Sequence, residues 1–356
     1  MVENTSLLSS RFLLLFVLLF AICCGLGYPA LNRGGERVPG LSDAQTYAAM
    51  VRGAELDTPN RHMQFRVLVP YMAKPFYWMG QGRVGTWDPA MFGLLVVNAL
   101  FTAATAMLLL VIVLRRFGNY QAALGASLLF LLNFAVPNLR LAGLIDAGEG
   151  FFLLLMISAL LEEKWRTLPI WAILGTITKE SFVPFMIVLT SSWYVVSRRT
   201  LSESARALAW IVTACGASLL TITILHWSIT GVLQSPWQFG SELHHNSRYL
   251  AHFAGSIVDR QLWYIFIWLL PLSLFRLTDF PRSWRVATAT TAAAAFAMNS
   301  FYGGAPGTVG RALFSIAGPL LSASVAMFLF TAPIVKVHHG RVMVNSADET
   351  PLKTSL

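Results

Sequence analysis

Residues Leu168–Val196 read LPIWAILGTITKESFVPFMIVLTSSWYVV, an apolar stretch interrupted at its middle by Thr178, Lys179, Glu180 and Ser181. The stretch can form one long helix with a buried ion pair, or two short helices that meet at a turn containing Lys179 and Glu180. Ionisable side chains within such a run are costly in a bilayer unless they are paired or solvated. The choice between the two structures also decides the orientation of every later segment.

The composition of the whole chain favours a membrane protein. The chain has 356 residues, of which 56% are hydrophobic and 12% are charged, and its mean hydropathy is +0.61. Soluble domains carry about 25% charged residues, so a water-soluble enzyme and a disordered chain are both excluded. The net charge of +9 is typical of membrane proteins whose cytoplasmic loops retain Lys and Arg, and it predicts no nucleic-acid partner. Three cysteines within apolar runs do not form a disulfide framework.

Eight further apolar runs follow one another along the chain. They are Phe12–Tyr28, Met91–Leu114, Ala122–Pro137, Phe151–Leu161 (extended back to about Leu141), Leu208–Val232, Leu262–Phe275, Val286–Phe301 and Ala312–Ile334. The first is interpreted as an uncleaved helix rather than a signal peptide, because many more follow. A turn at Lys179 keeps most Lys and Arg of the short loops on one side of the membrane. A single helix would move Arg198, Arg199, Arg206, Arg282 and Arg285 to the other side.

The turn is therefore preferred, and it predicts an all-α, polytopic fold of about 10 transmembrane or half-membrane helices. We expect one membrane domain over residues 1–335, with both termini in the cytoplasm, and a flexible cytoplasmic tail over residues 336–356. Residues 29–88 form a long non-cytoplasmic loop in this topology. Within the loop, Phe65–Met79 mixes aromatic and apolar residues with Arg66 and Lys74, which predicts an amphipathic helix at the membrane interface.

This topology brings a set of ionisable residues to the non-cytoplasmic side, and they are the candidate site residues. The set comprises Asp43, Arg66, Arg140, Asp146, Glu149, Lys179, Glu180, Arg248 and Arg311. Asp43 can act as a base toward an incoming hydroxyl or amide or help to hold a metal, or it can simply cap a helix that runs through Tyr47. The arginines and Lys179 can hold phosphate oxygens, or they can anchor lipid headgroups and form structural ion pairs.

A metal site and a nucleotide site are not predicted. His244, His245, Glu242 and His252 lie close in sequence, but their spacing matches no established ligand pattern, and a solvated loop is the simpler interpretation. No cofactor is expected, and the residues give no support for a divalent metal.

Four segments resemble the GT-C superfamily of membrane glycosyltransferases, which use polyprenyl-phosphate-linked sugars. SDAQTYAAMVRG around Asp43 is similar to the acidic first loop of that family, and FRVLVPYMA (Phe65–Ala73) to its Arg-x-Leu-x-Pro stretch. LGTITKESFVPFMIVL (Leu174–Leu189) resembles the short-helix pair with a Lys turn, and GRALFSIAGPLL (Gly310–Leu321) the start of a late helix.

The resemblance implies sugar transfer on the non-cytoplasmic face of a bacterial inner membrane. Asp43 is then the base, while Lys179, Arg66, Arg311 and Arg140 bind the donor phosphate. The remaining candidates are Glu180, Asp146, Glu149 and Arg248. The acceptor, whether glycan, lipid or protein, stays open, and Asp43 lacks the acidic neighbour seen in many members. Two other interpretations remain: a transporter or flippase of a lipid-linked substrate, and a non-catalytic assembly subunit.

Overall fold

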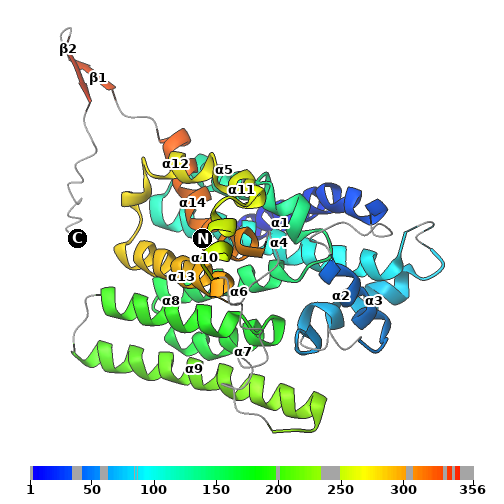
Figure 1. The fold of residues 1–356 in the computed structure, drawn as a ribbon. Helices are drawn as coiled ribbons and strands as arrows, with labels where there is room; N and C mark the ends of the chain where they lie inside the picture. Colours follow the sequence, from blue (N-terminus) through cyan, green and yellow to red (C-terminus); the bar gives the residue numbers. More distant parts are fainter. Residues whose placement is uncertain are drawn as a thin grey trace.

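The computed structural model is almost entirely helical (Figure 1). It describes residues 3–33, 42–56, 63–83, 85, 87–197, 201–233, 249–301, 308–331, 335–338 and 341–344. The helices are α1 (Glu3–Arg33), α2 (Ser42–Arg52), α3 (Leu68–Gly80), α4 (Pro89–Phe117), α5 (Tyr120–Leu131), α6 (Asp146–Leu161), α7 (Leu168–Thr178), α8 (Phe182–Val196), α9 (Leu201–Thr230), α10 (Tyr249–Ile257), α11 (Arg260–Phe266), α12 (Leu269–Ser273), α13 (Arg282–Phe301) and α14 (Thr308–Phe330). The predicted helical class is confirmed.

Four helices within the described residues are long and apolar enough to cross a membrane, namely Ser10–Pro29, Pro89–Phe117, Glu203–Thr230 and Val309–Phe330. Two of them, in α4 and α14, are 67% and 78% buried by other helices, whereas those in α1 and α9 are only 17% buried. Exposed apolar side chains such as Leu14 and Val212 therefore line the outer helices, as expected of surfaces that face lipid. Length and composition support a membrane protein but do not establish the predicted count of about ten spans.

Two predicted runs are interrupted rather than continuous. The run Ala122–Pro137 ends as α5 at Leu131 and resumes as a short π-helix over Val136–Arg140, and the run Leu262–Phe275 is divided into α11 and α12. Asn133 accounts for both breaks, because its Nδ2 donates to the Ile265 carbonyl (3.0 Å) and its Oδ1 accepts from the Ala135 amide (2.9 Å). Such side-chain bonds to the backbone compete with helical bonds.

The helix pair at Lys179 is confirmed. Lys179 has extended backbone between α7 and α8. Thr176 of α7 donates to Ser218 midway along α9 (2.9 Å), whereas Tyr194 near the end of α8 bonds Ser204 near the start of α9 (2.7 Å). The segment before α7 also lies beside the start of α9. The two helices α7 and α8 are therefore antiparallel. The turn that joins them lies at the end of the bundle opposite the start of α9.

The amphipathic helix predicted over Phe65–Met79 is observed as α3. Its Val69 and Ala73 are buried, and Gly93 lets α4 approach closely, because a Cβ there would lie 2.6 Å from the Ala73 carbonyl oxygen. Aromatic side chains on its other face, including Trp78, stay exposed. The alternation of buried and exposed residues explains why this short segment forms a helix although it contains the charged Lys74.

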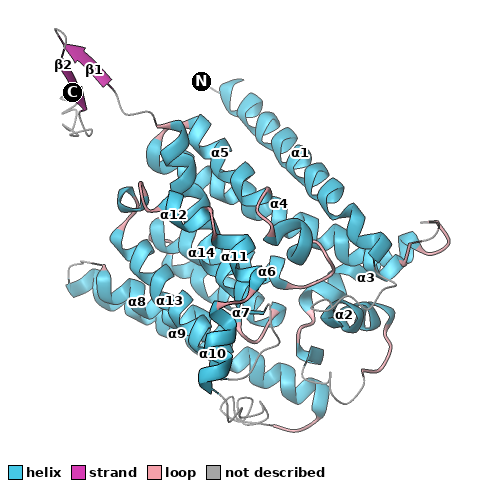
Figure 2. Cartoon of the chain, turned by 45° about the horizontal axis from the view of Figure 1, so that its top comes forward, coloured by secondary structure: helices cyan, strands magenta, loops and turns pink. Residues whose placement is uncertain are grey.

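The long helices run between two ends of the bundle (Figure 2), and the side chains at these ends differ in chemistry. Arg115 pairs with Glu162, which brings the ends of α4 and α6 together, and Asn119 lies by the end of α14 at Phe330. We call this the basic end. The starts of α4, α6 and α14, the turn at Lys179, and α2 and α3 lie at the opposite end, which we call the cluster end.

At the predicted flexible tail over residues 336–356, the described residues form a two-stranded antiparallel hairpin that begins one residue earlier. Its strands are β1 (Val335–His338) and β2 (Arg341–Val344), with Val335 opposite Val344. The expected domain boundary at residue 335 stays a prediction, and the rest of the tail lies outside the described residues.

Candidate functional site

Five separate segments bring ionisable side chains together at the cluster end. They come from α2, the segment before α3, the first turn of α6, the turn between α7 and α8, and the first turn of α14. We call this group the charged cluster, and its members are Asp43, Tyr47, Arg66, Asp146, Glu149, Lys179, Glu180, Ser181 and Arg311. Most of the sequence-predicted site residues are thus neighbours in space.

The innermost part of the cluster is a buried ion triad. The Lys179 ammonium lies 2.7 Å from Asp146 Oδ1 and 3.2 Å from Glu149 Oε2, and both carboxylates are buried. Ser181 Oγ donates to the other oxygen of Glu149 (2.5 Å). Asp146 and Glu149 lie one turn apart at the start of α6, where the helix dipole favours negative charge. These contacts satisfy charges that would otherwise be costly to bury.

Arg311 links this triad to the surface. Its Nε lies 3.2 Å from Asp146 Oδ2, and its Nη2 lies 3.5 Å from Asp43 Oδ2. The Asp43 side chain is 24% exposed, whereas that of Asp146 is 2% exposed. Asp43 is therefore the carboxylate in this chain of contacts that a ligand can reach.

Arg66 forms a second anchored cation. Its guanidinium binds Glu180 in a bidentate manner, with Nε 2.8 Å from Glu180 Oε2, and its Nη1 donates to Tyr47 Oη (2.6 Å). Burial raises the pKa of Tyr47, against the opposing effect of Arg66. Burial also disfavours the charge on Arg66, but Glu180 and Tyr47 outweigh it and raise the pKa of the guanidinium above its ordinary value. Arg66 stays cationic and oriented.

Neighbours in sequence have different partners here. Lys179 and Glu180 do not form the ion pair considered from the sequence, because Lys179 binds Asp146 and Glu149 while Glu180 binds Arg66. The extended backbone at Lys179 sends consecutive side chains in opposite directions. This single turn thereby connects the buried triad with the Arg66 pair.

Arg140 lies inside the bundle rather than at the accessible surface. Its guanidinium lies beside the stacked rings of Phe130 and Phe314, at 5.2 and 5.1 Å from their centroids, and its Nη2 donates to Ser315 (3.1 Å). It is buried, and it interacts electrostatically with Asp146 and Glu149 from within the protein. The geometry favours a supporting role for Arg140 over direct phosphate binding.

The structure does not describe four of the residues that were named from the sequence. Arg248, Glu242, His244 and His245 lie outside the described residues. Within the part of the chain that is described, no three His, Cys, Asp or Glu side chains form a group suited to hold a metal ion.

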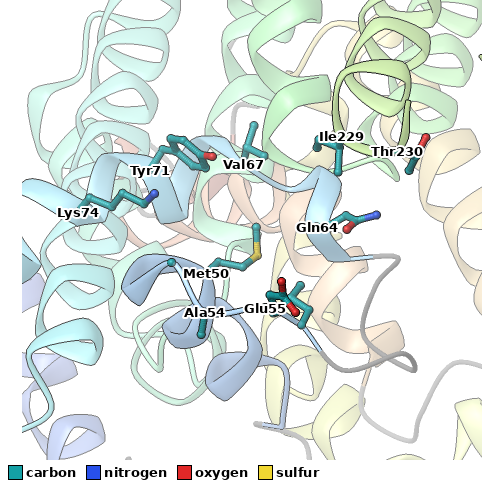
Figure 3. Close-up of a pocket in the computed structure, with 11 residues that line it drawn as sticks. Met50, Ala54, Glu55, Gln64, Val67, Tyr71, Lys74, Ile229 and Thr230 are labelled. Atoms are coloured by element: carbon teal, nitrogen blue, oxygen red, sulfur yellow. The ribbon is translucent and has the colours of Figure 1, made fainter. Parts of the chain in front are cut away.

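A cleft of about 630 Å³ opens between α2, α3 and the end of α9 (Figure 3). Figure 3 shows Tyr71 and Lys74 of α3 on one side, Met50 and Glu55 of the α2 segment across from them, and the end of α9 as a third wall. Lys74 Nζ lies 4.1 Å from the centre of the Tyr71 ring. The cleft adjoins the cluster because Met50 follows Tyr47 by three residues and Val67 follows Arg66.

Sequence reasoning did not single out Tyr47, Ser181 or this cleft. Tyr47 lies four residues after Asp43, so the helical period alone indicates a shared face of α2. No comparable signal predicts the cleft, because its walls come from three segments that are distant in sequence.

Comparison of the chain with protein-family models, with curated proteins and with solved structures finds no match in any of the three. The arguments about function therefore rest on the geometry of the cluster and on the motifs.

Proposed function

We propose that this protein is a membrane glycosyltransferase, which moves a sugar from a polyprenyl-phosphate donor to an acceptor on the non-cytoplasmic face. The observation that carries the proposal is Asp43, a partly exposed carboxylate that is held by Arg311 at the edge of a cluster of fixed cations beside a cleft. An exposed base next to immobilised positive charge is the arrangement that glycosyl transfer to a hydroxyl requires.

The proposed reaction is a single displacement. The acceptor hydroxyl gives its proton to the Asp43 carboxylate, and its oxygen forms a bond to the anomeric carbon. The bond from that carbon to the phosphate oxygen breaks, and the lipid phosphate leaves with the electron pair. Arg66 and Arg311 stabilise the developing phosphate charge, and Lys179 contributes from the layer beneath.

Substrate access through the cleft fits these distances. Asp43 and Met50 are seven residues apart on α2, which corresponds to about 10 Å along the helix axis. An extended acceptor or donor in the cleft can therefore reach Asp43. The Tyr71 ring and the Glu55 and Gln64 side chains offer the aromatic and hydrogen-bonding contacts that sugars use.

The proposed topology has about ten transmembrane or half-membrane helices and both termini in the cytoplasm of a bacterial inner membrane. Its support is the charge distribution of the short connections. Those at one end of the bundle carry Arg115, Arg116, Lys164, Arg166, Arg206, Arg276, Arg282 and Arg285, whereas the described short connections at the other end carry Arg140, Lys179, Arg260 and Arg311. An excess of Lys and Arg is typical of the cytoplasmic side. The cluster end then faces away from the cytoplasm.

A transporter is the second candidate, and the buried triad of Lys179, Asp146 and Glu149 is the observation that favours it. Buried ion pairs of this kind carry coupling ions or protons in many transporters. In that case Asp43 is dispensable for chemistry, whereas the triad is not.

The deciding experiment measures transfer from radiolabelled polyprenyl-phosphate sugars in membranes that contain the wild-type protein, Asp43→Asn or Lys179→Ala at matched expression. We expect Asp43→Asn to lower the rate about 100-fold or more, because a general base contributes on that scale.

Asp279→Asn is the matched control for this experiment. Asp279 is a similarly exposed aspartate that lies 3.6 Å from Arg276 at the basic end. We expect this substitution to leave the rate of transfer unchanged, because Asp279 lies at the opposite end of the bundle from Asp43. Full activity of Asp43→Asn removes Asp43 from the reaction, and loss of substrate uptake into vesicles by Lys179→Ala alone favours the transporter.

A further inference from the structure

A second concave site lies at the basic end, far from the charged cluster. Its volume is about 600 Å³, and it lies between the segment that connects α6 to α7 and the first turns of α9. We call it the basic-end pocket. The side chains used in the argument are Glu163, Lys164, Trp165, Arg166, Arg206 and Trp210.

The lining of the pocket carries an excess of positive charge. Lys164, Arg166 and Arg206 face one carboxylate, Glu163, within the lining. Lys164 is already paired with Glu162 outside it. Among the described residues, neither Arg166 nor Arg206 has a carboxylate within ion-pair distance, so both guanidinium groups are available to an anion. Arginine is suited to bind phosphate, because its planar fork of donors matches phosphate oxygens.

The backbone that presents these cations is unusual. Glu163 has φ of 55°, and it is the one non-glycine residue with positive φ in the described chain. This left-handed conformation ends α6, and the Lys164 amide bonds back to the Ala159 carbonyl (2.8 Å). The tight turn places Lys164 and Arg166 opposite α9 instead of letting them continue along α6.

Two features connect the pocket with lipid rather than with a solute in water. Trp165 and Trp210 belong to its lining, and tryptophan is enriched where membrane helices meet the headgroup region. Ile170 and Ile173 follow Arg166 at helical spacing, and they are 52% and 36% exposed. A cationic recess with exposed apolar side chains one and two turns further along the same helical segment matches a phosphate headgroup with acyl chains below it.

We propose that the basic-end pocket binds the phosphate headgroup of an anionic phospholipid, with Arg166 and Arg206 as its main contacts and the acyl chains along Ile170 and Ile173. The site is independent of the proposed glycosyl transfer, because it lies at the other end of the bundle and shares no residue with the charged cluster.

Native mass spectrometry of the full-length protein tests this proposal, with phosphatidylglycerol titrated into a phosphatidylcholine background. The variants are Arg166→Gln, Arg206→Gln and the double variant, and Arg282→Gln is the matched control. Arg282 is an exposed arginine at the same end and outside the pocket. A charge near an anionic membrane surface contributes about 1 kcal/mol. We therefore expect affinity to fall about 5-fold for each single variant and about 30-fold for the double variant, with no change for Arg282→Gln.

A lysine variant and a competition with inorganic phosphate test the proposal further. The double Arg→Lys variant retains the charge but lacks the planar fork, so it loses less affinity than the double Arg→Gln variant, which excludes misfolding as the cause of the loss. Inorganic phosphate at millimolar concentration leaves the bound lipid in place. Equal losses in Arg282→Gln and the double variant, or retained binding in the double variant, overturn the site. Displacement of the lipid by phosphate alone overturns the assignment to lipid.

Discussion

Gly150 determines how Arg140 fits inside the bundle. A Cβ at this position would lie 2.4 Å from Arg140 Nη2 and 3.0 Å from Nη1, so the bare backbone of α6 forms one wall of the guanidinium site. The guanidinium is buried, lies against the stacked rings of Phe130 and Phe314 and donates to Ser315, so it has little room to shift. The cation that supports Asp146 and Glu149 therefore depends on the absence of a single methyl group.

We expect Gly150→Ala to lower the stability of the protein by about 1–3 kcal/mol, the usual cost of overpacking a filled interior. The control is Gly216→Ala in α9, where an added Cβ meets nothing within 4 Å. That substitution raises stability by about 0.5–1 kcal/mol, since alanine favours helix over glycine. Thermal unfolding of the detergent-solubilised variants measures both. Equal shifts in the same direction contradict the tight packing at Arg140.

The position of α3 determines where Arg66 lies, because Arg66 precedes the first residue of that helix by two positions. Gly93 on α4 permits the contact, since an added Cβ meets the Ala73 carbonyl oxygen at 2.6 Å and the Tyr77 amide nitrogen at 3.2 Å. Both atoms belong to the backbone, so a side-chain rotation cannot relieve the clash. The whole helix has to move.

Gly93→Ala is therefore expected to cost about 1–3 kcal/mol of stability and to lower the rate of sugar transfer, since displacement of α3 moves Arg66 away from Glu180 and Tyr47. Gly25→Ala on α1, where nothing lies within 4 Å of the new Cβ, serves as the comparison. Melting curves and the transfer assay measure the two effects. Wild-type activity in Gly93→Ala is incompatible with a role of α3 in positioning Arg66.

At the scale of the whole molecule, the two ends of the bundle differ in chemistry, and this difference predicts opposite sides of a membrane. The ion pairs of the charged cluster are buried or half-buried, whereas pairs at the basic end such as that of Lys164 with Glu162 are more exposed. Gln81, in the segment that leads into α4, lies at the cluster end, and Glu163 lies at the basic end. Both are exposed.

Single cysteines at these positions test the arrangement, in a background where Cys23, Cys24 and Cys215 are replaced by serine. We expect a membrane-impermeant maleimide to label Gln81→Cys in intact cells and to label Glu163→Cys only after permeabilisation. Labelling of Glu163→Cys alone in intact cells reverses the orientation. Equal labelling of both positions in intact cells contradicts the assignment of the two ends to opposite sides.

Several features of this protein could be predicted from local sequence. The break between α7 and α8 follows from four polar residues inside an apolar run, and α3 follows from its alternating faces. The helical class follows from the composition. The interruptions at Asn133 could not be predicted, because they depend on a bond to Ile265, 132 residues further along the chain.

The helical, apolar character of the chain, the turn at Lys179 and the candidate charges at one end follow from local patterns of residues. Tertiary structure alone decided which cation binds which carboxylate: Lys179 pairs with Asp146 and Glu149, and Arg66 pairs with Glu180. It also decided that Asp43 is accessible and Arg140 is buried. Helical periodicity relates residues that are three or four positions apart in the sequence. These contacts join residues far apart in the sequence, which only the packing of separate helices brings together.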